Sequence, residues 1–376
     1  MGAELLKTKD EQKKKRIGVI FGGRSGEHEV SILSAASVIE AIDKSRFKIV
    51  PVGINKLGQW FLIKADLSDL TSLSDSRIKK IIPEESLKCS ETEQTLPLGK
   101  YPLAEPINVA EFAAMVDFAF PVLHGPYGED GTIQGLFEML SIPYAGPGVT
   151  CSALAMDKIF TKEIWIRSGL PVCAHRWLTV KSYYEHIDSS IRLVEELGYP
   201  VFVKPANMGS SVGVSRAADR KQLKAALNLA FLFDRRVIIE EEVIGRELEI
   251  ALLGGDSPEA GAIGEIVTDA QYYDYEAKYT EGRSQVIIPA EADVAIRSKI
   301  EELSLEAFTA LDGHGFSRID FFITDDGRVL LNEMNTIPGF TKFSMFPLLM
   351  MEKGYTYVQL IERIIELGYE RYHAKN

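Results

Sequence analysis

Several features that mark other classes of protein are scarce in this 376-residue chain. Its three cysteines, Cys89, Cys151 and Cys173, are widely spaced and form no CxxC pair, which argues against a disulfide framework or a cysteine zinc site and favours a reduced, cytoplasmic chain. No stretch approaches the roughly 20 apolar residues of a membrane helix, so we expect no membrane partner. The net charge of −12 argues against binding to nucleic acid.

Two common phosphate-binding loops are absent as well. The pattern GxxxxGK[ST] occurs nowhere, and Gly22-Gly23-Arg24-Ser25-Gly26 lacks the spacing of GxGxxG. Any nucleotide site must therefore be built in another way. The composition is that of an ordinary globular protein, with 46% hydrophobic and 26% charged residues. The length suggests about two or three domains.

The first part of the chain has the pattern of an α/β unit. Residues 16–21, 47–54 and 118–122 have the composition of buried strands, and residues 31–42 place their apolar side chains on one side of a helix. This strand–helix–strand order predicts a parallel sheet, and ligands commonly bind where such strands end. Gly146-Pro147-Gly148 marks the expected end of the unit.

The rest of the chain predicts two further units. The second contains a helix near 156–168 and then a strand, a helix and a strand, at 200–204, 221–233 and 237–242. The third contains a strand, a long helix, a β-hairpin and a closing helix, at 247–253, 296–311, 317–323 with 328–334, and 358–367. The polar stretch 62–109 reads as a hairpin or surface insertion.

The predicted hairpin carries a group of oxygen-bearing side chains. Because alternate residues of a strand point to one face, Arg318 and Asp320 share a side, and Glu333 and Asn335 share a side on the returning strand. Carboxylate and amide oxygens suit Mg²⁺, although a solvated hairpin with an ion pair explains the same residues. Pro338 and Gly339, just beyond, shape a tight backbone that can aim an N–H group.

A second candidate site is the loop Gly209-Ser210-Ser211-Val212-Gly213. Glycine lets a backbone approach phosphates closely, and N–H groups and hydroxyls bind them. A flexible turn between strands is the alternative. Lys204, at the end of the preceding strand, and Lys158 favour the phosphate interpretation.

Acidic residues supply the remaining candidates. Glu240 and the backbone near Val243 are candidates for contacting an adenine edge, and Glu247 for contacting ribose, although residue type alone favours a simple acidic strand end. Glu27 is a candidate for holding a substrate ammonium, or else it complements a helix N-terminus. The aromatic, charged stretch 272–279 has the pattern of a mobile lid.

Taken together, these motifs resemble those of the D-alanine–D-alanine ligases of the ATP-grasp superfamily, over nearly the full length of the chain. The motifs that carry the resemblance are Gly22 to Ser31, His124 to Gly131, Lys204 to Gly213, Tyr273 to Tyr279, Phe316 to Asp320, and Asn332 to Gly339. The resemblance implies an α/β, three-domain ATP-grasp architecture with an N-terminal parallel-sheet domain. Its expected domains are 1–147, 148–244 and 245–376, with ATP between the second and third.

The resemblance also implies a role for each matching residue. The implied catalytic residues are Glu27, Ser210, Tyr279, Arg318 and the backbone N–H of Gly339. The implied substrate contacts are Glu27, His124 and Ser344. The implied ATP contacts are Lys158, Lys204, Ser211, Glu240, Val243, Glu247 and Lys278. The implied ligands of two Mg²⁺ ions, for which Mn²⁺ can substitute, are Asp320, Glu333 and Asn335. Glu241 departs from the lysine seen in some members of the family.

The reaction implied is the ATP-dependent joining of two D-alanines through an acyl phosphate, for peptidoglycan precursors, by a cytoplasmic homodimer. Tyr279 favours D-alanine over D-lactate as the second substrate. A ligase that uses D-serine or D-lactate is an alternative, and so is an ATP-binding module without turnover. The presence of Arg318, Asp320, Glu333 and Asn335 argues against the last of these.

Overall fold

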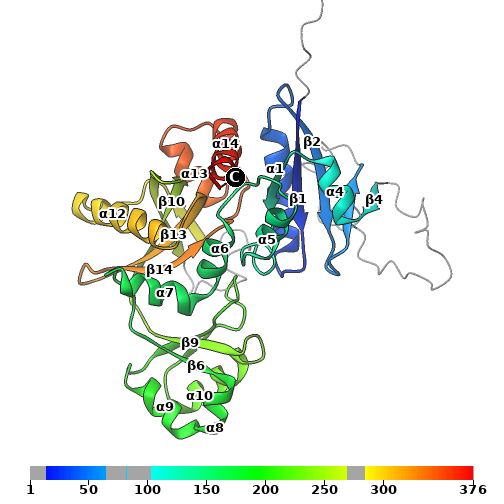
Figure 1. Cartoon of the computed structure of the whole chain (residues 1–376). Helices are drawn as coiled ribbons and strands as arrows, with labels where there is room; N and C mark the ends of the chain where they lie inside the picture. The colour runs from blue at the N-terminus through cyan, green and yellow to red at the C-terminus, as the bar shows by residue number, and fades with distance from the viewer. Residues whose placement is uncertain (1–13, 65–81, 83–102, 269–283, 376) are drawn as a thin grey trace, which may run out of the picture.

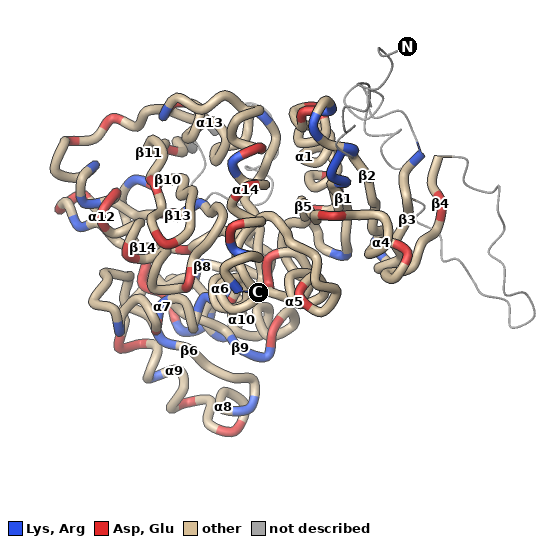
Figure 2. The backbone as a smooth tube through the Cα atoms, turned by 45° about the horizontal axis from the view of Figure 1, so that its top comes forward, with Lys and Arg blue, Asp and Glu red and all other residues tan. Residues whose placement is uncertain are grey.

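The computed structural model describes residues 14–64, 82, 103–268 and 284–375 as three sheets with helices packed around them. Figure 1 shows the N-terminal part, in blue and cyan, on one side of the molecule, with the central and C-terminal parts stacked on the other. The expected mixed α/β fold is confirmed. Figure 2 shows acidic and basic residues interspersed in all three parts.

The N-terminal sheet has the strand order β4-β3-β2-β1-β5. Its strands are β1 (Lys15–Gly22), β2 (Phe47–Ile54), β3 (Trp60–Ile63), β4 (Ala104–Ile107) and β5 (Phe118–Val122). As expected, β1 is parallel to both β2 and β5, whereas β3 and β4 form an antiparallel edge. The accompanying helices are α1 (His28–Ala41), α4 (Val109–Met115) and α5 (Thr132–Met139). The β3–β4 pair forms the two ends of the stretch 62–109; most residues between them lie outside the described part.

The central sheet has the order β6-β9-β7-β8 and is covered by three helices. Its strands are β6 (His175–Thr179), β7 (Val201–Pro205), β8 (Ser215–Ala217) and β9 (Arg236–Glu241), and its helices are α8 (Val180–Glu185), α9 (Ile187–Glu195) and α10 (Arg220–Ala230). Leucine, isoleucine and valine side chains of α9 and α10 pack on β7 and β9 as one small core. This core buries one face of the sheet.

The C-terminal sheet is antiparallel, with the order β12-β11-β10-β13-β14. Its strands are β10 (Gly245–Gly254), β11 (Glu259–Thr268), β12 (Ser284–Ile287), β13 (Gly315–Thr324) and β14 (Val329–Asn335). One core joins it to α6 (Val149–Met156), α7 (Lys158–Arg167) and α12 (Val294–Ala310). A second core joins it to α13 (Met345–Glu352) and α14 (Tyr357–Lys375), and continues into the N-terminal sheet.

Helix α7 matches the helix expected near 156–168, whereas α6 was not expected. The two helices are separated at Asp157, whose carboxylate accepts hydrogen bonds from the N–H groups of Ile159 and Phe160 at 3.1 and 3.2 Å and so caps α7. Trp165 of α7 is fully buried against the C-terminal sheet. Lys162 of the same helix contacts Asn332 of β14 and Glu240 of β9, so it lies between this sheet and the central one.

The described residues include no helix with the length and apolarity that crossing a bilayer requires.

Candidate active site between the sheets

The register of the β13–β14 hairpin brings the candidate metal ligands together. Asp320 is opposite Glu333, and Arg318 is opposite Asn335. On the other side of β13, Glu249 of β10 is opposite Asp320, so three carboxylate-bearing residues form a row across three strands. The carboxylate of Glu249 was not foreseen, although its place two residues after Glu247 gives both side chains the same face of β10.

Arg318 neutralises much of this acidic row. Its guanidinium makes hydrogen bonds of 2.7 Å to each carboxylate oxygen of Asp320, and its Nε lies 3.0 Å from Glu249 Oε2. Asn335 Nδ2 donates to Asp320 Oδ2 at 3.0 Å. Burial alone would lower the pKa of Arg318, but the carboxylates of Asp320 and Glu249 raise it well above its ordinary value. Arg318 is therefore a fixed positive charge.

The hairpin residues fit a magnesium ion that is shared with phosphate groups. Within the described ranges, no three His, Cys, Asp or Glu side chains form a cage that would hold a metal unaided. Mg²⁺ does not need one, because it typically takes one or two carboxylates and fills its other positions with water and substrate phosphates. Asp320, Glu333 and the amide oxygen of Asn335 are hard donors on adjacent positions, as this mode of binding requires.

Facing the hairpin is a buried cluster of charges. Glu240, 2% exposed, lies between two lysines: Lys204 Nζ donates to its Oε2 at 2.6 Å, and Lys162 Nζ is 3.1 Å from its Oε1. Burial works to raise the pKa of Glu240, but Lys162 and Lys204 together hold it far below its usual range. Lys204, on the central sheet, also interacts electrostatically with Glu333, on the hairpin of the C-terminal sheet.

Lys158, at the start of α7, links the loop of residues 209–213, called here the glycine–serine loop, to the hairpin. Its Nζ donates to the carbonyl of Met208 at 2.8 Å and lies 3.6 Å from Glu333 Oε2. Two neighbouring residues of the loop, Ser210 and Ser211, have φ of 51° and 59°, in the left-handed region. Such a conformation costs about 1–3 kcal/mol for a residue with a side chain, and its presence at a site is associated with function.

Glu27 of the N-terminal part lies against the same loop. A Cβ added at Gly209 would be 3.7 Å from Glu27 Oε2, and one added at Gly125 would be 3.2 Å from it. Its carboxylate therefore lies between the two glycine-rich motifs, the one that follows β5 and the one that follows β7. The structure thus brings residues from all three parts of the chain to one place.

His124 and Glu129 tie the N-terminal part to residues 337–340. His124 Nδ1 lies 2.9 Å from the carbonyl of Ile337, which can only accept, so Nδ1 carries the proton, and Nε2 is 3.2 Å from Ser34 Oγ. Burial lowers the pKa of His124, which keeps the ring neutral. Glu129 accepts from the N–H groups of Gly125 at 2.7 Å and Ile337 at 3.0 Å.

Gly339 and Ser344 lie next to each other at the end of this segment. A Cβ at position 339 would come within 3.2 Å of Ser344 Oγ, a tight contact. The hydroxyl of Ser344 accepts from the N–H of Thr341 at 3.0 Å, immediately before α13 begins.

Of the other candidates, Val243 is in the loop after β9 and Glu247 is on β10. Lys278 and Tyr279, with the rest of the expected lid, lie outside the described residues.

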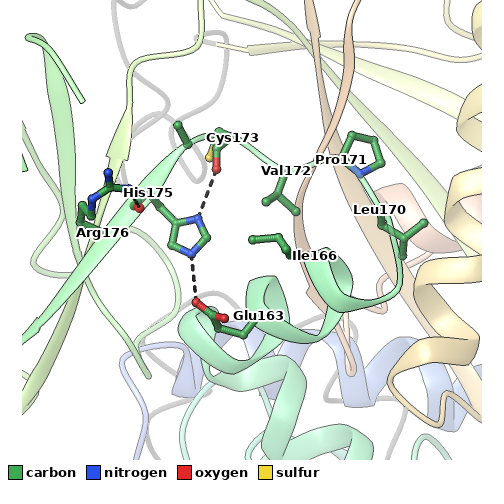
Figure 3. A pocket seen from close by; sticks show the side chains of 9 residues that line it. Glu163, Ile166, Leu170, Pro171, Val172, Cys173, His175 and Arg176 are labelled. Atoms are coloured by element: carbon green, nitrogen blue, oxygen red, sulfur yellow. Dashed lines mark hydrogen bonds and ion pairs between the residues drawn. The ribbon is translucent and has the colours of Figure 1, made fainter. Parts of the chain in front are cut away.

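A cavity of about 450 Å³ lies behind the charged cluster, at the linker between α7 and β6. Figure 3 shows His175 inside it, joined to the Cys173 carbonyl and to Glu163. None of the candidate site residues that the structure describes lines this cavity. It is therefore separate from the candidate active site, although Cys173 Sγ also lies 3.5 Å from Lys162 Nζ.

Two sheets that enclose lysines between them, one of which carries the candidate metal ligands on its β13–β14 hairpin, define, together with the adjacent α/β domain, a protein of the ATP-grasp class. Sequence comparison narrows the class. The family model described as D-ala D-ala ligase N-terminus matches residues 16–147, and the one described as D-ala D-ala ligase C-terminus matches residues 164–366. The chain belongs to the D-alanine–D-alanine ligase family.

Relatives in sequence and in structure agree with this assignment. The D-alanine–D-alanine ligase of Bacillus velezensis is 43% identical, with 95% of this chain and 98% of the relative covered. That of Listeria welshimeri is 44% identical, with 96% and 98% covered. Among solved structures, the VanG D-Ala:D-Ser ligase of Enterococcus faecalis has a TM-score of 0.81 at 34% identity, with 95% and 100% covered. The D-alanine–D-alanine ligase of Coxiella burnetii has a TM-score of 0.80 at 30% identity, with 96% of each chain covered.

Proposed function

We propose that this protein joins two molecules of D-alanine, using ATP, to make D-alanyl-D-alanine for peptidoglycan precursors. The observation that carries the proposal is the convergence of Glu27, the glycine–serine loop and the Arg318–Asp320 pair between the sheets. A carboxylate is a poor electrophile, and transfer of the γ-phosphoryl group of ATP gives an acyl phosphate with a good leaving group. The amine of the second D-alanine then displaces phosphate and forms the peptide bond.

The residues of the chain have distinct roles in this proposal. Glu27 holds the ammonium of the first D-alanine. Lys158 and Lys204, with the hydroxyls of the glycine–serine loop, position the phosphates. Asp320, Glu333 and Asn335 would hold Mg²⁺, which neutralises charge on the transferring phosphoryl group when it is bound.

Arg318 and the N–H of Gly339 stabilise the oxyanion that forms when the amine attacks. His124 and Glu129 support this step by holding Ile337, close to Gly339, through their hydrogen bonds. Ser344, adjacent to Gly339, contacts the carboxylate of the second D-alanine. In this way the N-terminal part both binds substrate and orients the group that stabilises the oxyanion.

Nucleotide and lid contacts complete the proposed site. Glu240, with the backbone near Val243, faces adenine, Glu247 faces ribose, and Ser211 and Lys278 contact the phosphates. Ser210 and Tyr279 join Glu27 in a hydrogen-bonded set that closes over the substrates. Such closure matters because water would otherwise hydrolyse the acyl phosphate.

We place the reaction in the cytoplasm, where the buried free thiols of Cys151 and Cys173 stay reduced, and we expect a homodimer.

The test is ADP formation by the purified protein with ATP and Mg²⁺, in the presence of D-alanine, L-alanine or neither. The proposal predicts rapid ADP formation with D-alanine alone and D-alanyl-D-alanine as the product. Nucleotide binding without ADP formation would instead support a non-catalytic ATP-binding module.

The second substrate needs its own test, because one similar solved structure is named a D-Ala:D-Ser ligase. Equal concentrations of D-alanine, D-serine and D-lactate at neutral pH, followed by mass spectrometry of the products, separate the alternatives. We expect the D-alanine dipeptide to dominate. A dominant D-Ala–D-Ser or depsipeptide product would overturn this assignment of the acceptor while leaving the activation step in place.

A further inference from the structure

A β-bulge places one of the candidate metal ligands. Along the hairpin, Asp320 is opposite Glu333, but the next residue, Phe321, is opposite Leu331, so Asn332 is an extra residue. If the same residues paired in regular register from Phe321 and Leu331 onward, Glu333 would be opposite Ile319. Ile319 is fully buried in the core beneath α7 and α12. The bulge therefore turns the carboxylate of Glu333 to the same face as Asp320.

Lys162 holds this bulge. Its Nζ donates to the carbonyl of Asn332 at 3.1 Å, directly before Glu333 in the chain. The neighbouring N–H of Leu331 donates to the carbonyl of Pro171 at 2.9 Å, so the backbone on the other side of Asn332 is also fixed. A bulge leaves its extra residue out of the strand ladder, and the lysine supplies a donor at that point.

The same ammonium reaches the central sheet. Lys162 Nζ lies 3.1 Å from Glu240 Oε1, while Lys204 binds the other oxygen of Glu240 at 2.6 Å. Lys162 is 1% exposed and lies one helical turn after Lys158 on α7, so both lysines project from one face of this helix. One buried side chain thus contacts the partner of a candidate phosphate lysine and the backbone beside a candidate metal ligand.

We propose that Lys162 is a positioning residue for the ligase reaction: it fixes Glu333, through the bulge at Asn332, and Lys204, through Glu240, at the separation that a metal-bound ATP requires. This inference rests on the proposed function. Lys162 itself touches neither substrate nor metal. Its substitution should therefore weaken the binding of ATP and Mg²⁺ far more than the binding of D-alanine.

The first experiment is steady-state kinetics of Lys162→Met, which keeps the length of the side chain and removes the charge. We expect the concentrations of ATP and Mg²⁺ needed for half-maximal rate to rise about 10–100-fold, as for supporting residues in metal sites. The KM for D-alanine should stay within about twofold. Lys299→Met, which removes a surface lysine paired with Glu302 on α12, is the matched control and should change nothing.

A second variant separates positioning by charge from simple packing. Lys162→Ala leaves space for a small molecule, and exogenous ethylammonium should restore the ATP and Mg²⁺ dependence whereas ethanol should not. Unchanged ATP and Mg²⁺ dependence in Lys162→Met, a uniform loss across all substrates, or equal rescue by ethanol would overturn the proposal.

Folding and turnover are controlled separately. If Lys162→Met does not fold, Lys162→Gln is measured in its place, and failure of both to fold would contradict the proposal by assigning the residue to the fold as a whole. If the wild-type protein forms no ADP, the proposed function fails, but the inference is still tested by calorimetric titration with a non-hydrolysable ATP analogue. The variant should then lose most of the Mg²⁺-dependent part of the affinity, and an affinity equal to wild type would refute the role of Lys162.

Discussion

Arg318 and Asp320, two residues apart on β13, are joined by two parallel hydrogen bonds of 2.7 Å. This two-pronged arrangement fixes the plane of the carboxylate as well as its position. It also points the guanidinium along the sheet face that carries Glu333 and Asn335. The residue proposed to stabilise the oxyanion therefore also orients a residue proposed to bind the metal.

Arg318→Lys should lower kcat by about 100–1,000-fold, the range seen when one oxyanion donor is removed. A lysine keeps the charge but cannot form the planar two-pronged contact with Asp320. The measurement is steady-state ADP formation, with Arg328→Lys in the exposed hairpin turn as the control. A kcat close to wild type would show that the two-pronged contact with Asp320 does not matter to the reaction.

Asp320→Asn should raise the Mg²⁺ concentration needed for half-maximal rate, because a neutral amide is a weaker ligand for a hard cation than a carboxylate. Titration with Mg²⁺ at saturating ATP gives this quantity. Asp326→Asn is the control, since Asp326 lies in the turn of the same hairpin and pairs with Arg328. The same half-maximal Mg²⁺ concentration for Asp320→Asn and wild type would count against a metal at this face.

Ser210 offers a test of strain against chemistry. Ser210→Ala and Ser210→Gly both remove the hydroxyl, but only glycine adopts the observed φ of 51° without steric cost. We expect both variants to lose activity. The free energy of unfolding of the glycine variant should be about 1 kcal/mol higher than that of the alanine variant. Denaturant titration measures the difference. Equal stabilities would mean that the loop is not strained at this position.

Glu129 should make stability depend on pH. Burial, with the nearby carboxylate of Glu27, raises its pKa to about 8 from an ordinary 4.5. The folded state then holds this proton more tightly than the unfolded state, so its contribution is complete below pH 4.5 and is lost as the pH rises through about 8. Urea unfolding between these values should show wild type losing stability relative to Glu129→Gln. Two parallel stability curves would refute the raised pKa.

Much of the framework follows from hydrophobic pattern alone. Strands β2 and β5 occupy the ranges expected from their apolar runs, and the hairpin and α14 begin within a few residues of the expected positions. The alternation of polar residues on β13 also predicted that Arg318 and Asp320 share a face, as their hydrogen bonds now show. These are local features, and local sequence determines them.

What the sequence could not supply depends on contacts between distant segments. Lys162 was missed because lysine is rarely buried, although its spacing of four from Lys158 on one helix was a usable signal. The bulge at Asn332 has no single-residue signature. Glu129 lay inside a recognised motif, but its burial beside Ile337, 208 residues away, exists only in the fold.

In the proposed reaction, the carboxylate of one amino acid is activated by phosphorylation between these sheets. The most direct measurement uses D-alanine labelled with ¹⁸O in its carboxylate, followed by mass spectrometry of the inorganic phosphate released. An acyl phosphate leaves one carboxylate oxygen on phosphate, so we expect one ¹⁸O atom in the phosphate for each dipeptide formed. Dipeptide formation with unlabelled phosphate would contradict it.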